Sequence, residues 1–328
     1  MANELIDHLA PSAVVLSVAV ALDLAIGDPV YAWHPVRLIG RLLTAIENRL
    51  RAVGADGYGG GVILFLALSA MALAVTTLAV AGAHLVSWPL GWIVHAFILY
   101  SFLALGDLVH HVLRIERAVR AGDLERARSA VRMLVGRDTD RLDGAACRRA
   151  GVESLSENLA DGFVSPVCWY LVAGLPGIVL FKVVSTMDSM VGYRTPAYER
   201  FGWCGARLDD AMNYVPARLT WLVIATVALI IPGFSGRKAW TVGLQQHTLL
   251  LGPNSGWSEA ATAGAIERRI VGPIWLGGAL VTDLWIGDPA DPPLATAQDV
   301  TRALVLAVTS GLVVTLAGAT ALWLLSAS

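Results

Sequence analysis

Long apolar runs are the feature of the sequence that most restricts how the chain can fold. A helix that crosses the hydrocarbon core of a bilayer needs about 20 mainly apolar residues. Five runs approach or meet that length, at residues 11–26, 62–86, 90–108, 216–234 and 303–325. With 56% apolar residues and a mean hydropathy of +0.62, the chain is predicted to be an all-α, polytopic integral membrane protein.

Two further apolar segments have more than one interpretation. Residues 163–184 are long enough to cross, but Pro166 and the sequence Gly-Leu-Pro-Gly at 174–177 interrupt them, which predicts a broken or re-entrant helix. Residues 270–286 are short and contain Asp283, and they either span the membrane or re-enter it. We therefore expect about five to seven membrane-embedded helices in a single membrane domain, residues 1–328.

The distribution of basic residues predicts the orientation, because Lys and Arg favour the cytoplasmic side. Residues 1–12 contain neither, whereas ten Arg lie between residues 108 and 163. The N-terminus is therefore expected outside, and the loops after the first and third apolar runs are expected in the cytoplasm. Apolar residues recur at helical spacing within residues 107–162, which predicts a cytoplasmic insertion of amphipathic helices.

A short motif occurs twice, as DLAIGDP at residues 23–29 and as DLWIGDP at residues 283–289. Each copy stands at the end of an apolar run, where Gly can end a helix and Pro cannot continue it. We expect both copies to be helix exits at a membrane interface, with Asp28 and Asp288 at similar polar boundaries.

Three carboxylates are spaced four residues apart, at Glu153, Glu157 and Asp161, so a continuous helix would place them on one face. Like charges at this spacing repel each other, and a cation should compensate them. Either Arg149 or Arg148 fills that role, or a divalent ion does, because hard oxygen ligands suit magnesium.

A second acidic group, Asp188, Asp209 and Asp210, adjoins apolar runs. An ionised carboxylate within the hydrocarbon costs about 2.5–3.5 kcal/mol, so such residues usually face a cavity and act there. Neighbouring Arg side chains either bind phosphate or carboxylate, or anchor helix ends at the interface. Farther along, a turn precedes a helix of small residues, and Asn254 and Glu259 are the polar candidates there.

Several classes of function find no support in the sequence. A formal net charge of −2 without a basic tail argues against nucleic-acid binding. The chain has no phosphate-loop, dinucleotide-binding or zinc-protease motif. Its three cysteines are too few and too far apart for a zinc site or a disulfide framework, and His84 and His95 are interpreted as packing groups within apolar runs.

Six polar motifs, in this order, resemble the adenosylcobinamide-phosphate synthase family of cobalamin biosynthesis. They are GDP with HPVRLIGR (27–41), GRDT (136–139), ESLSENLADG (153–162), STMDSMVGY (185–193), GARLDDAMNYVPARLT (205–220) and PNSGWSEAATAGA (253–265). The resemblance covers residues 23–287, and Ser185 and Met187 stand where the family would have Asn and Leu. It implies a multi-pass protein of the cytoplasmic membrane whose active site faces the cytoplasm.

The resemblance also implies a reaction: an ATP- and Mg²⁺-dependent ligation that joins adenosylcobyric acid, a corrinoid, to aminopropanol or its O-phosphate through an amide bond. The residues expected to take part in catalysis are Glu153, Glu157, Asp161, Asp188, Asp209 and Asp210, with Mg²⁺ on Glu157, Asp161 and Asp188. Those expected to bind substrate or phosphate are His34, Arg37, Arg137, Asn158, Lys182, Arg194, Arg207, Asn213, Arg218, Asn254 and Glu259. Later cobalamin-assembly enzymes of the membrane are candidate partners.

Two other classes of function stay open at this point. A solute transporter would also use broken helices and intramembrane carboxylates, although transporters of that kind usually have more spans. A non-catalytic membrane scaffold or signalling protein, such as those of β-lactamase induction, would not need the acidic motifs, and this chain retains all of them.

Overall fold

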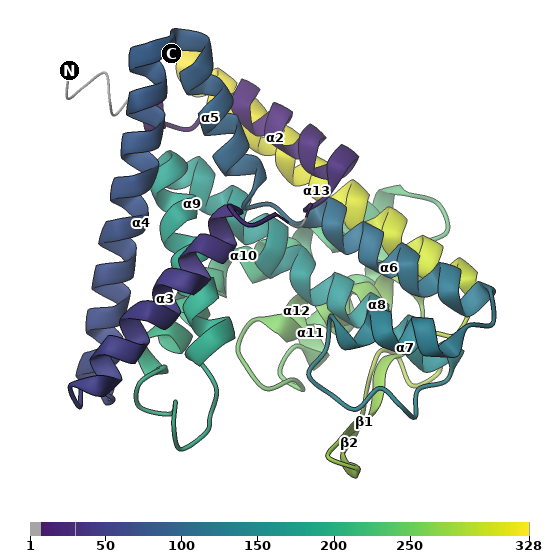
Figure 1. The fold of residues 1–328 in the computed structure, drawn as a ribbon. Coiled ribbons are helices and arrows are strands. Elements are labelled where there is room, and N and C mark those ends of the chain that lie inside the picture. Colours follow the sequence, from purple (N-terminus) through teal and green to yellow (C-terminus); the bar gives the residue numbers. More distant parts are fainter. Residues whose placement is uncertain (1–7, 30, 328) are drawn as a thin grey trace. The chain divides into compact units, whose positions relative to one another are not determined.

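The computed structural model describes residues 8–29 and 31–327, and nearly all of its regular structure is helical (Figure 1). A single antiparallel hairpin interrupts the helices near the C-terminus. The elements are α2 (Ala13–Ile26), α3 (Pro35–Ala52), α4 (Tyr58–Val86), α5 (Trp88–Tyr100), α6 (Leu105–Arg120), α7 (Leu124–Arg132), α8 (Gly144–Leu159), the π-helical turn η1 (Ala160–Val164), α9 (Ser165–Val191), α10 (Trp203–Ile230), α11 (Gly236–Gln246), α12 (Ser255–Ile266), β1 (Ile270–Leu276), β2 (Ala279–Ile286) and α13 (Ala297–Ala327).

Four helical segments among the described residues are long and apolar enough to cross a membrane. They are α4, the segment Gly144–Val191, α10 and α13; the pair α5 and α6, bent by 44°, makes a fifth if it counts as one span. The prediction of a multi-pass, all-α membrane protein is thus confirmed. The apolar run at 90–108 is divided between α5 and α6, because α5 ends at Tyr100, where the Ser101 hydroxyl donates to the Phe97 carbonyl.

The chain divides into two compact units, each of which we describe by itself. Unit 1 comprises Met1–Ala104, Ser165–Asn213 and Thr315–Ser328, and within it α9 packs against α3, α4 and α5. Unit 2 comprises Leu105–Val164 and Tyr214–Val314, and within it α8 packs against α6, α7, α12 and β1.

The predicted amphipathic helices of residues 107–162 are α6, α7 and α8 of unit 2. Their apolar faces meet in a small core of fully buried side chains, because the periodic apolar residues of all three helices face inward. This core contains Ile115, Ala118, Ala127, Val131, Leu142, Cys147 and Ala150. The helices predicted there from periodicity are therefore confirmed.

Residues 270–286 were predicted to span or re-enter the membrane, and this was wrong, because they form the hairpin of β1 and β2. Gly277 and Gly278 make its turn with positive φ values of 59° and 80°, which glycine adopts without strain. A short apolar run has no periodicity that separates a strand from a helix. The second copy of the repeated motif consequently leaves a strand, so only the first copy, after α2, is a helix exit.

The predicted interruption of residues 163–184 is confirmed within α9. Ala173 and Gly174 have non-helical dihedral angles, whereas Pro166 lies in the first turn of the helix and does not break it. A second irregularity precedes α9, because η1 carries Asp161 in a π-helical turn. The predicted spacing of Glu153, Glu157 and Asp161 assumed a continuous α-helix, and the wider π turn changes the direction of the third carboxylate.

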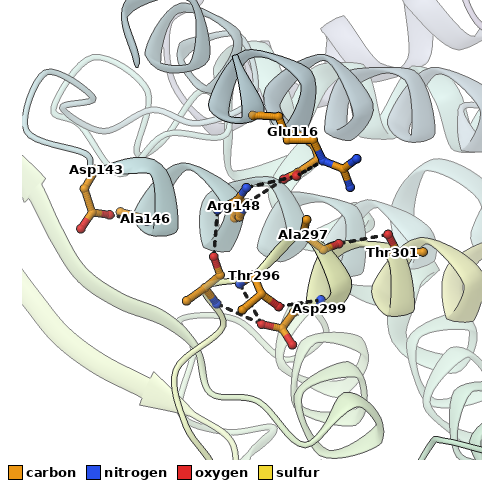
Figure 2. Close-up of polar contacts among 10 residues, drawn as sticks. Glu116, Asp143, Ala146, Arg148, Thr296, Ala297, Asp299 and Thr301 are labelled. Carbon is orange, nitrogen blue, oxygen red and sulfur yellow. Dashed lines mark hydrogen bonds and ion pairs between the residues drawn. The ribbon is translucent and has the colours of Figure 1, made fainter. Parts of the chain in front are cut away.

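Ion pairs fix α8 and the start of α13 within unit 2 (Figure 2). The Arg148 guanidinium binds both carboxylate oxygens of Glu116 on α6, at 2.7 and 3.1 Å, and donates to the Ala295 carbonyl at 3.0 Å. The Asp299 carboxylate accepts from the backbone N–H groups of Ala295 and Thr296 and so caps α13. Arg148 therefore positions α8 and does not compensate the carboxylates that follow it.

Candidate functional site

Unit 2 brings together acidic residues that are distant in the sequence. Glu153 and Glu157 lie on α8, Glu259 lies on α12, and these two helices pack against each other. We call these three residues the glutamate cluster. Asp161, in η1, is close enough to act electrostatically on Glu259. The structure thus joins two motifs that the sequence analysis could only treat separately.

One cation faces the glutamate cluster directly. The Arg137 guanidinium donates to Glu153 Oε2 at 2.6 Å, and both side chains are mostly buried, at 9% and 16% exposure. The sequence analysis expected Arg149 or Arg148 to compensate these carboxylates. The direct partner is instead Arg137, while Arg149 acts on Glu153 at longer range and has its guanidinium over the Trp285 ring at 5.2 Å.

The loop that carries Arg137 is held by the hairpin. Asp138 accepts from the backbone N–H of Gly278 at 2.7 Å, and its own N–H donates to the Trp275 carbonyl at 2.8 Å. Thr139 accepts from Arg132 Nε at 3.2 Å. In the GRDT motif, therefore, Arg137 faces the carboxylates and the residues after it fix the loop.

Glu259 is the most deeply buried carboxylate of the cluster. Its residue is 3% exposed, and its Oε2 atom has no hydrogen-bond partner among the described residues. Burial and the nearby carboxylates of Glu157 and Glu153 raise the pKa of Glu259 well above its usual range. The cause is that a buried carboxylate charge without a donor is costly, so a cation bound beside Glu259 would favour its ionised form.

A group of aromatic side chains, Tyr214, Trp257 and His247, lies with two of the predicted binding residues, Arg218 and Asn254. In the sequence, Trp257 is two residues before Glu259 of the glutamate cluster. The Arg218 guanidinium lies over the Tyr214 ring at 3.4 Å and the Trp257 ring at 5.0 Å, and His247 stacks on Trp257 at 3.8 Å. Arg218 also reaches the side-chain oxygen of Asn254 at 3.5 Å. A stacked guanidinium keeps part of its fork free for a planar or phosphate-bearing ligand.

Asn158, also a predicted binding residue, bonds within its own helix. Its side-chain amide donates to the Ser154 carbonyl at 2.9 Å and to the Ser154 hydroxyl at 3.3 Å. Its nitrogen is thus already engaged, and its carbonyl oxygen is the atom left to accept a hydrogen bond.

Unit 1 holds the second acidic group, which we call the aspartate cluster: Asp188 on α9, and Asp209 and Asp210 on α10. Asp188, Asp210 and Lys182 all lie close enough to act electrostatically on Asp209. A Cβ on Gly205 would lie 2.8 Å from the Met187 Cβ, so this glycine permits the close approach of α9 and α10.

A hydrogen-bonded chain supports the aspartate cluster. Asn213 donates to Asp209 Oδ2 at 3.0 Å, and the Ser165 hydroxyl donates to the Asn213 side-chain oxygen at 2.5 Å. Asn213 is 1% exposed and Ser165 is fully buried. Asp209 is therefore held by neutral dipoles, whereas Arg207 pairs with Asp210 at 3.6 Å on the exposed side of α10.

Each of the remaining predicted residues of unit 1 has its own separate surroundings. His34 Nε2 is 2.8 Å from the Asp28 carboxylate of the first repeated motif. Arg37 lines a cleft of about 520 Å³ together with Arg41, whose guanidinium donates to the Ala32 carbonyl. Arg194 is exposed in the segment between α9 and α10.

Comparison with known proteins places the chain in a family. The model of the family described as CobD/Cbib protein matches residues 16–307, which is most of the chain. The protein belongs to the CobD/Cbib family. Three relatives, each named cobalamin biosynthesis protein CobD, are similar over most of their length. The one from Sinorhizobium sp is 41% identical over 299 residues, 87% of this chain and 90% of the relative.

The other two CobD proteins show the same extent of similarity. The protein of Pelobacter propionicus is 40% identical over 279 residues, 85% of this chain and 86% of the relative. That of Rhodobacter capsulatus is 38% identical over 301 residues, 90% of this chain and 92% of the relative. No solved structure matches the chain significantly. The family resemblance inferred from the polar motifs is thus confirmed, and with it a role in cobalamin biosynthesis.

In this CobD/Cbib protein, sequence analysis missed Tyr214 and Trp257 as members of the candidate site. Both stand inside motifs that carry the resemblance, Trp257 two residues before Glu259 and Tyr214 next to Asn213. Their position within polar motifs was the available signal. An aromatic residue in a membrane protein is ordinarily assigned to packing or to the interface, so the signal was not used.

Proposed function

We propose that this CobD/Cbib family member joins adenosylcobyric acid to (R)-1-amino-2-propanol, or to its O-phosphate, in an ATP-dependent amide ligation. We place the reaction at the cytoplasmic face of the membrane. The observation that carries the proposal is the mostly buried Arg137–Glu153 pair with further carboxylates beside it, in a protein whose family acts in cobalamin biosynthesis. Buried charged groups concentrated in one place are typical of a reaction centre and are costly for stability alone.

The chemistry requires activation of both reactants, because a carboxylate is a poor electrophile and an alkylamine is protonated at neutral pH. A carboxylate oxygen of the corrin side chain attacks the terminal phosphorus of ATP, and the bond to the ADP oxygen breaks, which gives an acyl phosphate and ADP. The ammonium first gives one proton to a base, for which a carboxylate of either cluster is suited, and the neutral amine nitrogen then attacks the acyl carbon. Inorganic phosphate leaves with the oxygen, and the nitrogen loses its second proton to solvent.

The donor set fits a magnesium ion shared with the nucleotide. No group of three His, Cys, Asp or Glu side chains among the described residues could hold a metal by itself. Mg²⁺ usually takes only one or two carboxylates and completes its shell with phosphate oxygens and water. In this proposal the carboxylates available to it are Glu157 and Asp161 in unit 2 or Asp188 in unit 1. When bound, the ion would offset charge on the transferring phosphoryl group.

Cationic side chains complete the proposed roles. Arg137 in unit 2 and Arg37, Lys182, Arg194 and Arg207 in unit 1 are the donors that we assign to phosphate or to the substrate carboxylate. The guanidinium forks of the four arginines suit both groups, which present paired oxygen atoms, and the Lys182 ammonium supplies a point charge.

The test uses the purified protein in nanodiscs with adenosylcobyric acid, magnesium-ATP and each amine in turn. We expect a product heavier than adenosylcobyric acid by the mass of the amine minus water, together with one ADP per product. Omission of ATP is the control and should leave the corrinoid unchanged. Retention of corrinoid without any ATP-dependent product would contradict the proposal and favour a transporter.

A second experiment tests the cytoplasmic orientation. Single cysteines at positions 190 and 255, in a variant without the three native cysteines, report the side of the membrane on which α9 ends and α12 begins. We expect both to react with an impermeant thiol reagent from the cytoplasmic side. Clear labelling of both from the opposite side would exclude a cytoplasmic site built from these segments.

A further inference from the structure

The buried charges of unit 2 do not balance around Glu259. Glu153 has a direct cationic partner, the Arg137 guanidinium at 2.6 Å. Glu259 interacts electrostatically with three negative charges, those of Glu157, Glu153 and Asp161, and with the positive charge of Arg137. The cluster therefore has more carboxylates than direct cationic partners, and the buried Glu259 Oε2 atom has no hydrogen-bond partner among the described residues.

The other cations of unit 2 are already engaged elsewhere. Lys238 lies 2.6 Å from Asp291, 3.3 Å from Glu267 and 3.5 Å from Asp288. Arg218 donates to the Tyr214 carbonyl at 2.6 Å. Arg149 donates to the Leu294 carbonyl at 3.4 Å through one terminal nitrogen, and its buried Nε has no hydrogen-bond partner among the described residues. None of these three side chains donates a hydrogen bond to Glu259. A buried carboxylate oxygen without a donor is costly, so its presence in the fold points to a ligand.

The surroundings of Glu259 limit the size of that ligand. Every residue of α12 from Gly256 to Ile266 is buried, and α12 packs tightly on α11 and α8. A Cβ on Gly264 would meet the Lys238 carbonyl oxygen at 2.4 Å, which shows how closely α11 lies. A small donor suits such a closely packed helix, and a primary ammonium is small and carries three N–H donors.

We propose that Glu259 binds the amino group of the small amine substrate. This assignment rests on the proposed ligation, because that reaction supplies an aminoalkanol as the second reactant. The ammonium completes the charge balance of the glutamate cluster and satisfies Glu259 Oε2. Arg137 stays on Glu153 and keeps that carboxylate from competing for the ammonium.

The decisive variant is Glu259→Gln, which keeps the shape of the side chain and removes its charge. We expect the KM for the amine to rise on the order of 10- to 100-fold, because a hydrogen bond to a charged group is lost. The KM values for ATP and adenosylcobyric acid should stay within about twofold, since only the amine is bound by this residue. Glu125→Gln, in the same unit with a side chain that is 87% exposed, is the matched control and should change none of them.

A binding experiment separates this inference from the proposed reaction. The wild-type protein, without ATP or corrinoid, is titrated calorimetrically with 1-amino-2-propanol and with propane-1,2-diol, which has a hydroxyl in place of the amine. We expect the wild type to show heat of binding with 1-amino-2-propanol and none with propane-1,2-diol. This heat of binding should be lost in Glu259→Gln and retained in Glu125→Gln. If no amide product ever forms but this pattern holds, the proposed ligation fails and the amine site stands.

Three results would overturn the amine site while leaving the ligation intact. The first is an amine KM in Glu259→Gln equal to that of the wild type. The second is a loss of Mg²⁺ binding, titrated with the metal alone, while amine binding is kept. The third is a clear fall in the melting temperature of Glu259→Gln. Loss of an unpaired buried charge should leave the stability equal or higher. A fall would therefore show that the carboxylate supports the fold.

Discussion

Two clusters of carboxylates, the glutamate cluster of unit 2 and the aspartate cluster of unit 1, are stabilised in different ways. In unit 2 a guanidinium faces Glu153 directly, and Glu259 is left with an unsatisfied oxygen. In unit 1 a chain of neutral donors, Ser165 and Asn213, supports Asp209. A cluster stabilised by one ion pair depends on that pair, whereas a cluster supported by dipoles spreads the cost over several bonds. The two should therefore respond differently to substitution.

The largest expected effect concerns activity and tests whether both clusters serve one reaction. Glu157→Gln and Asp188→Asn each remove one carboxylate charge and keep the volume of the side chain. We expect each to lower kcat/KM for adenosylcobinamide formation about 100- to 1,000-fold, the usual effect of losing one charged group that acts on the transition state. The measurement is initial rate at equal amounts of inserted protein. Wild-type activity in either variant would remove that cluster from the site.

The second effect concerns stability and contrasts two arginines. Arg137→Met leaves Glu153 buried without its partner, and we expect a loss of about 3–5 kcal/mol in the free energy of unfolding. Arg207→Met is the matched change in unit 1, where the side chain is 65% exposed and lies 3.6 Å from Asp210. We expect less than about 1 kcal/mol there. Denaturant titration in detergent measures both.

A double variant refines this contrast. Arg137→Met with Glu153→Gln removes the buried charge together with its partner, so part of the lost stability should return. Equal destabilisation by the single and the double variant would mean that Arg137 acts through packing and not through the ion pair.

The third effect tests the chain of dipoles in unit 1. Asn213→Leu removes the donor to Asp209 and the acceptor of the Ser165 hydroxyl at a position that is 1% exposed. We expect a loss of about 1–3 kcal/mol, the cost of buried polar groups without partners. A change below about 0.5 kcal/mol, measured by the same titration, would show that water or another group satisfies Asp209.

The smallest effect depends on pH and concerns the second copy of the repeated motif. A hydrogen bond to Asp291 raises the pKa of Lys238, and a hydrogen bond from the Ala290 backbone N–H lowers the pKa of Asp288. A raised lysine pKa contributes stability that is lost only as pH rises through the folded-state value. A lowered aspartate pKa contributes stability above its usual value of 3.8, which is lost as pH falls through the folded-state value.

Lys238→Met should accordingly lower the melting temperature by about 2–4 °C at neutral pH, a value typical of a partly exposed network. The difference from the wild type should shrink below about pH 4, where the carboxylates become protonated. A difference that is constant from pH 3 to pH 7 would show that Lys238 contributes by packing of its aliphatic stem.

Much of the candidate site could be read from the sequence, because the polar motifs stand out against apolar surroundings. The positions of Glu153, Glu157 and Glu259 were identified as candidates, and they do gather in unit 2. Their partners could not be identified. Arg137 is sixteen residues from Glu153, and the loop between them, fixed by contacts with the hairpin, decides that these two side chains meet. Arg148, which is closer to Glu153 in the sequence than Arg137 is, instead binds Glu116 of α6.

The sequence by itself determined the class of the protein, the main helices and the break near Gly174, because hydropathy, periodicity and helix breakers act on neighbouring residues. Only the tertiary structure decided that residues 270–286 form a hairpin, that Asp161 lies in a π turn and that Glu259 Oε2 has no donor among the described residues. Those outcomes depend on which distant segments pack together. Pairing between strands and burial of charge are settled by long-range contacts that no local pattern encodes.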